Sequence, residues 1–99
     1  MEKINSQERI LLIVEKLAAS KTHGMTNKTL AAELRTLEAN ICRDLKILKS
    51  RGWIERSDDD GRWRMSPKFG NFAGIMMQGF REAKLKLTEE EARYATAMQ

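Results

Sequence analysis

The chain has 99 residues, of which 41% are hydrophobic and 6% aromatic, and this length suits one small domain. It is too short for a doubly wound nucleotide-binding fold or an α/β barrel. Lysine and arginine number 18 against 14 acidic residues, and because the resulting net charge of +4 is only mildly basic, the positions of the basic residues matter more than their number.

A first helix is predicted over about residues 7–19. Ser6 has the side chain of an N-cap, and apolar residues recur behind it at helical spacing. These apolar residues are Ile10, Ile13, Val14, Leu17 and Ala18. The polar stretch 20–24, which ends in glycine, predicts a loop after this helix.

A short second helix is predicted over about residues 27–34, with Thr26 or Asn27 as its cap. Its apolar stripe consists of Leu30, Ala31 and Leu34. Met25, just before the helix, is expected to pair briefly as a strand residue. The two residues after the helix form a tight connection to the next one.

A third helix is predicted over about residues 37–50, with Gly52 at the position that follows a helix C-terminus. Its apolar stripe consists of Leu37, Ile41, Leu45 and Leu48. At 100° per residue, the opposite face carries Thr36, Ala39, Arg43, Lys46 and Ser50, with Asn40 at its margin.

A β-hairpin follows the third helix. Residues 53–57 and 62–66 are expected to form strands, and the aspartates and glycine of residues 58–61 are typical of the turn between them. Because side chains alternate along a strand, Trp63 and Met65 form an apolar face of the second strand, and Arg62 and Arg64 form a basic face. The hairpin is therefore expected to have an apolar underside over the core.

Residues 68–99 are expected to form a helical extension. Phenylalanines and methionines between 69 and 80 predict a helix, although each internal glycine costs about 1 kcal/mol relative to alanine. Residues 88–91 read as a capping box, which predicts a separate short helix over 92–98. The apolar helix needs a partner, so the extension either folds back on the domain or forms a homodimer through residues 68–98.

The order of these elements is that of a winged helix-turn-helix domain, mainly α with a small β-hairpin, over residues 6–67. Residues 30–34 and 41–54 resemble the helix-turn-helix pattern of bacterial winged-helix regulators. Residues 61–67 resemble the wing exit of IclR-type DNA-binding domains. The similarity covers about residues 6–73 and implies binding of double-stranded DNA.

Two departures from the IclR-type pattern affect these expectations. Arg35 stands at the turn position that the family usually gives to glycine, and Thr36 replaces a buried aliphatic residue. A non-glycine residue with positive φ is uncommon, which leaves the angle of the third helix open. The family's effector-binding domain has no counterpart after residue 73, so no small-molecule effector is expected.

The third helix supplies the residues expected to read bases in the major groove. Arg43 suits guanine, Asn40 adenine, Glu38 cytosine N4 and Ala39 a thymine methyl, while Lys46 contacts a base or phosphate. Other interpretations remain open: Arg43 could pair with Asp44 or Glu38, Asn40 could be a surface residue, and Glu38 could stabilise the positive helix end.

The second helix and the hairpin supply the residues expected to contact phosphates. On the hairpin, Arg62 and Arg64 would engage phosphates or the minor groove, or else form salt bridges with the neighbouring acids of residues 58–60. The start of the second helix could hold one phosphate or simply be capped. The candidate residues there are Thr26, Asn27, Lys28 and Thr29, together with Arg35 in the turn after the helix.

We therefore predict a small cytoplasmic transcriptional regulator of phage, prophage or plasmid type, whose partner is double-stranded DNA. A winged-helix protein-interaction module without DNA binding is the alternative. An enzyme is not expected, because the sequence lacks a Ser/His/Asp order and a phosphate-binding glycine loop. One cysteine, one histidine and no apolar run long enough for a bilayer predict no cofactor, no metal and no membrane association.

Overall fold

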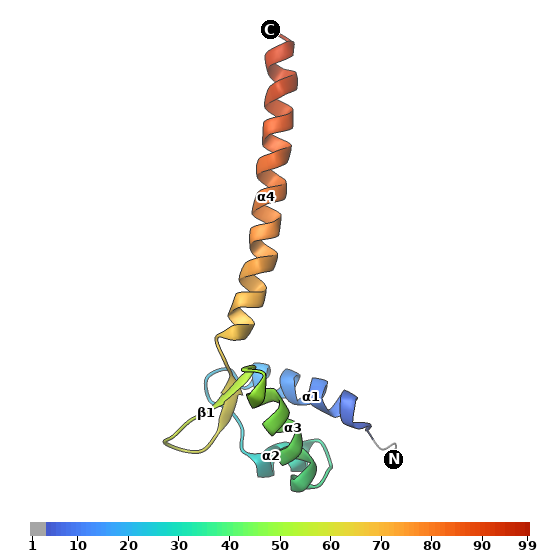
Figure 1. Ribbon diagram of the computed structural model, residues 1–99, viewed down its shortest axis with the longest axis vertical. Helices are drawn as coiled ribbons and strands as arrows, with labels where there is room; N and C mark the ends of the chain where they lie inside the picture. Colours follow the sequence, from blue (N-terminus) through green and yellow to red (C-terminus); the bar gives the residue numbers. More distant parts are fainter. Residues whose placement is uncertain (1–3) are drawn as a thin grey trace. The chain divides into compact units, whose positions relative to one another are not determined.

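The computed structural model describes residues 4–99 (Figure 1). Within this range the elements are α1 (Ser6–Ala19), α2 (Asn27–Glu33), α3 (Glu38–Ser50), β1 (Ile54–Arg56), β2 (Trp63–Met65) and α4 (Lys68–Ala97). The chain is thus mainly helical with a small antiparallel hairpin, as expected. It divides into two compact units, one up to Phe69 and one over Gly70–Gln99.

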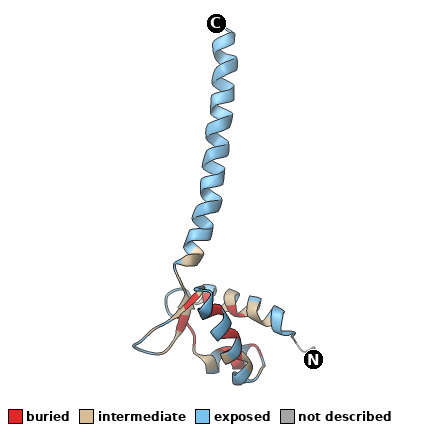
Figure 2. Cartoon of the chain, in the orientation of Figure 1, coloured by how far each residue is buried: buried red, intermediate tan, exposed pale blue. Residues whose placement is uncertain are grey.

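The first unit packs its three helices and the hairpin around one apolar core, which Figure 2 shows in red. Ile13 and Leu17 of α1 are fully buried in it, which agrees with the predicted apolar stripe of this helix. The remaining buried apolar residues are Met25, Leu30, Ala31, Leu34, Ile41, Leu45, Leu48, Ile54 and Trp63.

Two predicted details at helix N-termini are wrong, namely the cap residue of α1 and the burial of Leu37. The cap of α1 is Asn5 rather than Ser6, because the Asn5 side chain accepts the backbone N–H of Glu8 at 2.8 Å. Leu37 is not part of the buried stripe of α3 but is 72% exposed. It is the N-cap residue of α3 and has extended backbone, so helical spacing does not describe where its side chain lies.

The turn between α2 and α3 has the left-handed conformation that glycine usually provides. Arg35 adopts a φ of 54°, and the next residue, Thr36, donates its backbone N–H to the carbonyl of Ala31 at 3.0 Å. Arg35 therefore adopts the left-handed conformation for which the IclR-type pattern uses glycine. A left-handed non-glycine residue carries a cost of about 1–2 kcal/mol that the surrounding turn must offset.

The end of α3 and the start of the hairpin follow the sequence prediction. Gly52 has a φ of 77° directly after the C-cap Arg51, and Trp53 donates its backbone N–H to the carbonyl of Leu48 at 3.0 Å. Trp53 is only half-buried, and its ring meets that of Phe69 edge to face with centroids 5.1 Å apart.

Met25 extends the hairpin on the β2 side, as predicted. Its backbone exchanges two hydrogen bonds with Trp63, at 2.9 and 2.8 Å, while β1 pairs with β2 on the other side. Gly24 allows this close approach: a Cβ atom on it would lie 2.6 Å from the Trp63 carbonyl oxygen. The hairpin is therefore attached to the start of α2 by backbone hydrogen bonds.

The helical extension is one continuous helix, α4, and not two. The hydroxyl of Thr88 donates to the carbonyl of Lys84 at 2.9 Å, which is a contact inside a helix and not an N-cap. The predicted capping box is therefore wrong. Every residue of Gly70–Gln99 is exposed, and Figure 2 shows α4 almost entirely in pale blue. Within the described residues, no helix is both long and apolar enough to cross a membrane.

Candidate nucleic-acid interface

The exposed face of α3 carries the residues that periodicity assigned to it. Ala39, Arg43, Lys46 and Ser50 are exposed, whereas Ile41, Asp44, Leu45 and Leu48 are buried on the other side. Asn40 is half-buried at the margin of the exposed face, as predicted. Lys46 makes no ion pair within residues 4–99, so its ammonium group can meet an anionic ligand.

Three polar side chains are joined in a row along this face. Asn40 donates its side-chain amide N–H to the hydroxyl of Thr36 at 2.9 Å, and its amide oxygen accepts from the guanidinium of Arg43. The alternative pairing of Arg43 with Asp44 or Glu38 is absent from the described residues. The Arg43 side chain is thus directed toward Asn40 in this structure.

The acidic residue next to Arg43 lies in the core. Asp44 forms a bidentate ion pair with Arg9 of α1, through Nε and through Nη2 at 3.1 Å, and the two side chains are only 4% and 11% exposed. The hydrogen bond to Asp44 raises the pKa of Arg9 above its usual range. This pair was not predicted from the sequence, in which its members lie 35 residues apart.

The pair matters for the exposed face because it removes a negative charge from it. Of the acidic residues of α3, only Glu38, in the first turn, is exposed. The middle of the outward surface of this helix therefore combines Arg43 and Lys46 with no neighbouring carboxylate from α3 itself.

The start of α2 contains one residue whose predicted role needs correction. Thr26 caps the helix by accepting the backbone N–H of Thr29 at 3.1 Å. The Asn27 amide oxygen accepts the indole N–H of Trp63 at 2.7 Å, and its amide nitrogen donates to the sulfur of Cys42 at 3.1 Å. Both ends of the Asn27 side-chain amide are thus used inside the domain, which leaves the backbone N–H of this residue for a phosphate contact.

The two predicted hairpin arginines are both paired with acids. Arg62 forms an ion pair with Asp60 at 3.7 Å and contacts the ring Nε2 of His23 at 2.7 Å. Arg64 pairs with Glu55 on the adjacent strand at 3.1 Å. The salt-bridge alternative therefore describes Arg62 correctly, and the partner of Arg64 is an acid that the sequence analysis did not consider.

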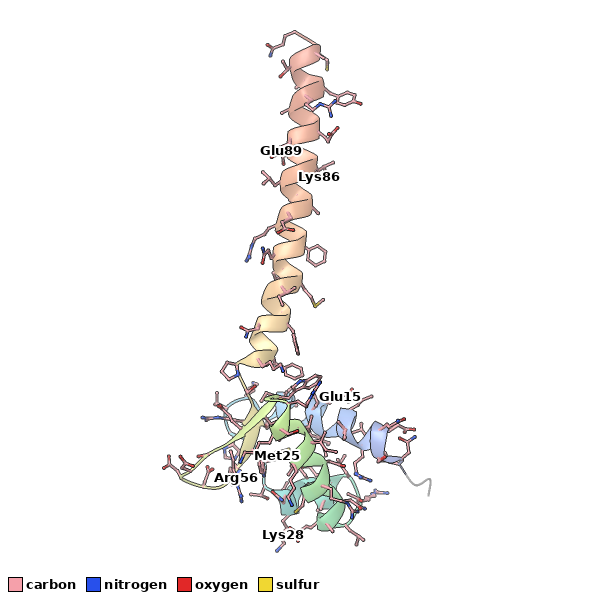
Figure 3. The ribbon with its side chains drawn as sticks, viewed as in Figure 1. Glu15, Met25, Lys28, Arg56, Lys86 and Glu89 are labelled. Atoms are coloured by element: carbon pink, nitrogen blue, oxygen red, sulfur yellow. The ribbon has the colours of Figure 1, made fainter. Side chains whose placement is uncertain are left out.

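Two further cations, which were not among the predicted site residues, lie beside the ring of Trp63. The Arg56 guanidinium is 5.3 Å from the ring centroid and the Lys49 ammonium 5.9 Å. Arg56 is the strand partner of Trp63, so the hairpin register was the feature that could have revealed it. Figure 3 shows Arg56 and Lys28 extending toward the same side of the view.

We call the exposed cations of α2, α3 and β1 the basic face. Trp63 contacts all three elements, because its ring centroid lies 5.9 Å from the Lys49 ammonium and 5.3 Å from the Arg56 guanidinium, and its N–H bonds to Asn27, the neighbour of Lys28. The members of the basic face are Lys28 from α2, Arg43, Lys46 and Lys49 from α3, and Arg56 from β1.

Comparison of the chain with protein-family models, with curated proteins and with solved structures gives no match. Within residues 4–99, no group of three or more histidine, cysteine, aspartate or glutamate side chains could hold a metal ion. The interpretation of the basic face accordingly depends on its own geometry and charge.

Proposed function

We propose that the chain is a small transcriptional regulator of the winged helix-turn-helix type that binds double-stranded DNA through the basic face. The observation that carries this proposal is the sorting of charge on α3. Arg43 and Lys46 point outward, while Asp44 is neutralised in the core by Arg9. A helix whose exposed surface is basic suits a polyanion.

The shape of α3 suits the major groove of a duplex. This groove is about 12 Å wide and accepts one helix. Arg43 would make a bidentate contact to guanine O6 and N7, exchanging its bond to Asn40, whose amide oxygen would then be free to accept from adenine N6. Ala39, one turn before Arg43, is small enough to let the helix approach base edges closely.

The rest of the basic face would hold the sugar–phosphate backbone. Lys28, Lys49 and Arg56 present cations from three elements, and contacts to phosphates fix the register of a protein on a duplex. Arg62 and Arg64 can join them only by leaving Asp60 and Glu55. We therefore assign the main hairpin contact to Arg56 and a secondary one to this pair of arginines.

The test begins with duplexes selected from a random pool by the full chain. Binding to the selected duplex is then measured by fluorescence anisotropy for Arg43→Ala, Lys46→Ala and Arg62→Ala. We expect Arg43→Ala to cost about 1–3 kcal/mol and to relax specificity at one base pair. Arg81→Ala, which removes one exposed charge from α4, is the matched control and should bind as the parent does.

A salt titration separates phosphate contacts from base contacts. Lys46→Ala should lower the slope of log K against log salt by about one, because each neutralised phosphate releases counterions. If all three substitutions leave duplex affinity unchanged at moderate salt, α3 does not contact DNA and the proposal is wrong.

The second candidate is a protein-interaction module. It is favoured by the large apolar side chains that the first unit exposes, Leu37 and Ile47 among them, and by the pairing of Arg62 and Arg64 with acids. An apolar interface would keep its affinity as salt rises, whereas duplex binding must weaken steeply. The same titration therefore decides between the two functions.

A further inference from the structure

The exposed helix α4 carries a heptad repeat that runs along almost its whole length. Placing Phe80 at position a puts the a and d positions at regular spacings of four and three residues. The a residues are Ala73, Phe80, Leu87 and Tyr94, and the d residues are Met76, Ala83, Glu90 and Ala97. Seven of these eight side chains are apolar or aromatic, and we call the set the heptad stripe.

The repeat begins at Ala73 rather than one step earlier. Phe69 has the next d position toward the N-terminus, but its ring already packs against Trp53 in the first unit. Residues 73–97 span about 37 Å of helix at 1.5 Å per residue, which gives three and a half heptads. This is long enough for a coiled coil.

From these observations we infer that α4 pairs with α4 of a second copy of the chain as a parallel, in-register, two-stranded coiled coil. The stripe is exposed, with Phe80, Leu87 and Tyr94 each more than half accessible. Most of the stability of an amphipathic helix comes from packing of its apolar face, so this face needs a partner. A second copy supplies an identical stripe with the same spacing.

The residues beside the stripe favour the parallel direction. In a parallel pair, a g residue faces the e residue five positions later on the partner. Lys86 at g then faces Glu91 at e of the partner helix. The two-fold symmetry of the pair gives two such attractions. Phe72 at g would face Met77 at e, which joins two apolar side chains.

The antiparallel direction brings like charges together. The antiparallel pairing that overlaps the whole stripe sets Ala73 opposite Ala97 and Leu87 opposite Ala83. In that pairing Lys84 lies next to its own copy, and so does Lys86, because these residues are close to the centre. Two lysine–lysine contacts replace the two Lys86–Glu91 attractions, so the charges at the flanking e and g positions favour the parallel pair.

The one charged member of the stripe is Glu90, which would face its own copy at a d layer. Its carboxylate is held by Arg93 of the same helix at 2.7 Å, which offsets part of the repulsion. A polar residue at a single core layer lowers the stability of a coiled coil and fixes its register. Glu90 thus weakens the in-register pair, and the apolar layers and the Lys86–Glu91 attractions have to offset this repulsion.

The pairing is tested with two neighbouring leucines. Leu87 lies at a and Leu85 at f, on the far side of the helix, although both are well exposed, at 71% and 60%. We expect Leu87→Glu to weaken dimerisation by about 100-fold, because it places two carboxylates in an apolar layer. Leu85→Glu should change it by less than about threefold. Sedimentation equilibrium of the full chain measures both.

Each alternative occupant of the stripe gives a different result. A full chain that stays monomeric at 100 µM, as it would if α4 covered its stripe with its own first unit, overturns the inference. A trimer or tetramer overturns the two-stranded assignment. Equal effects of the two leucine substitutions would mean that the copies meet through some other surface. None of these outcomes depends on whether the chain binds DNA.

The direction is tested by a disulfide. In a Cys42→Ser background, Ala73→Cys should cross-link to its own copy on oxidation, because the two a positions face each other in the parallel pair. In the antiparallel pair the same cysteines lie about 36 Å apart, since residue 73 faces residue 97. Cross-linking only between mixed Ala73→Cys and Ala97→Cys chains would overturn the parallel assignment.

Discussion

Arg9 and Asp44 join α1 to α3 beneath the basic face. Both side chains are nearly inaccessible to water, and their charges satisfy each other through two hydrogen bonds. Taking two ions out of water is expensive, so such a pair contributes little net stability, but removal of one partner is costly. The pair therefore matters chiefly because it fixes how α3 is rotated on the core.

Substitution of Asp44 alone should cost more stability than replacement of both Arg9 and Asp44. Asp44→Ala leaves the Arg9 guanidinium buried without a counter-charge and should lower the free energy of unfolding by about 3 kcal/mol. The double substitution Arg9→Met with Asp44→Leu should cost clearly less, because it leaves no buried charge. Urea denaturation followed by circular dichroism measures both; a larger loss for the double variant would show that the charges themselves stabilise the fold.

Asp60 gives the hairpin turn a dependence on pH. Its carboxylate accepts the backbone N–H of Arg62 at 3.0 Å, and chiefly for this reason its pKa lies below its usual value. A lowered pKa in the folded state means that the ionised group contributes stability above its ordinary pKa, and that this contribution is lost as the pH falls through the lowered value.

An NMR titration of the Asp60 carboxyl carbon checks this expectation. The resonance should titrate below the ordinary aspartate value of about 3.8, and the amide proton of Arg62 should shift over the same pH range. Asp60→Asn keeps an oxygen acceptor for the amide and removes the titration, so it is the control. A carboxyl pKa at or above the ordinary value would contradict the hydrogen bond.

The positions of single site residues could be predicted from the sequence only where helical spacing determines which face of a helix a side chain lies on. Arg43 and Lys46 were assigned correctly to the outward face because one face of α3 is apolar. The pairing of Asp44 with Arg9 joins two helices whose relative rotation no local pattern gives. The capture of the Asn27 side chain by Trp63 likewise depends on the position of the hairpin.

At the scale of elements, the short helices and the hairpin were predicted closely because each has its own boundary residues. Thr26 caps α2, and Gly52 ends α3. The extension was predicted less well, because Thr88 followed by three glutamates resembles a helix start. In the structure the preceding turns already satisfy those backbone groups, so α4 continues through them.

Replacement of the charged layer in α4 should strengthen the coiled coil that we propose. Glu90→Leu removes two facing carboxylates and adds an apolar d layer, so the dimer dissociation constant should fall by about tenfold or more, or about 1.4 kcal/mol. Glu89→Leu, one residue away at position c, is the matched control and should leave it nearly unchanged. Analytical ultracentrifugation over a dilution series decides; equal effects at both positions would contradict the heptad assignment.

At the scale of the whole molecule, a coiled coil through α4 would bring two basic faces into one particle. A dimeric DNA-binding protein reads two half-sites, and its affinity depends on their spacing through the helical repeat of the duplex, about 10.5 base pairs. A two-fold relation between the two basic faces of such a dimer would favour an inverted repeat as the preferred site.

Dimerisation through α4 together with DNA binding through the basic face predicts that Leu87→Glu loses affinity only for a duplex with two half-sites. Leu87→Glu should bind a duplex with one half-site as the parent does, but lose at least about tenfold in affinity for a duplex with two correctly spaced half-sites. Fluorescence anisotropy on both duplexes measures the difference. Loss on both duplexes would indicate a folding defect, and no loss on either would show that each copy binds DNA independently.

The attachment of the hairpin to Met25 has a further consequence for how a duplex could be selected. Because backbone hydrogen bonds join β2 to Met25, which precedes the N-cap of α2, the hairpin is held at a fixed distance from the helix-turn-helix. A duplex that meets both would have to adjust its own curvature to this spacing. Steps that bend easily, such as TA and CA, would then be preferred at positions that no side chain touches.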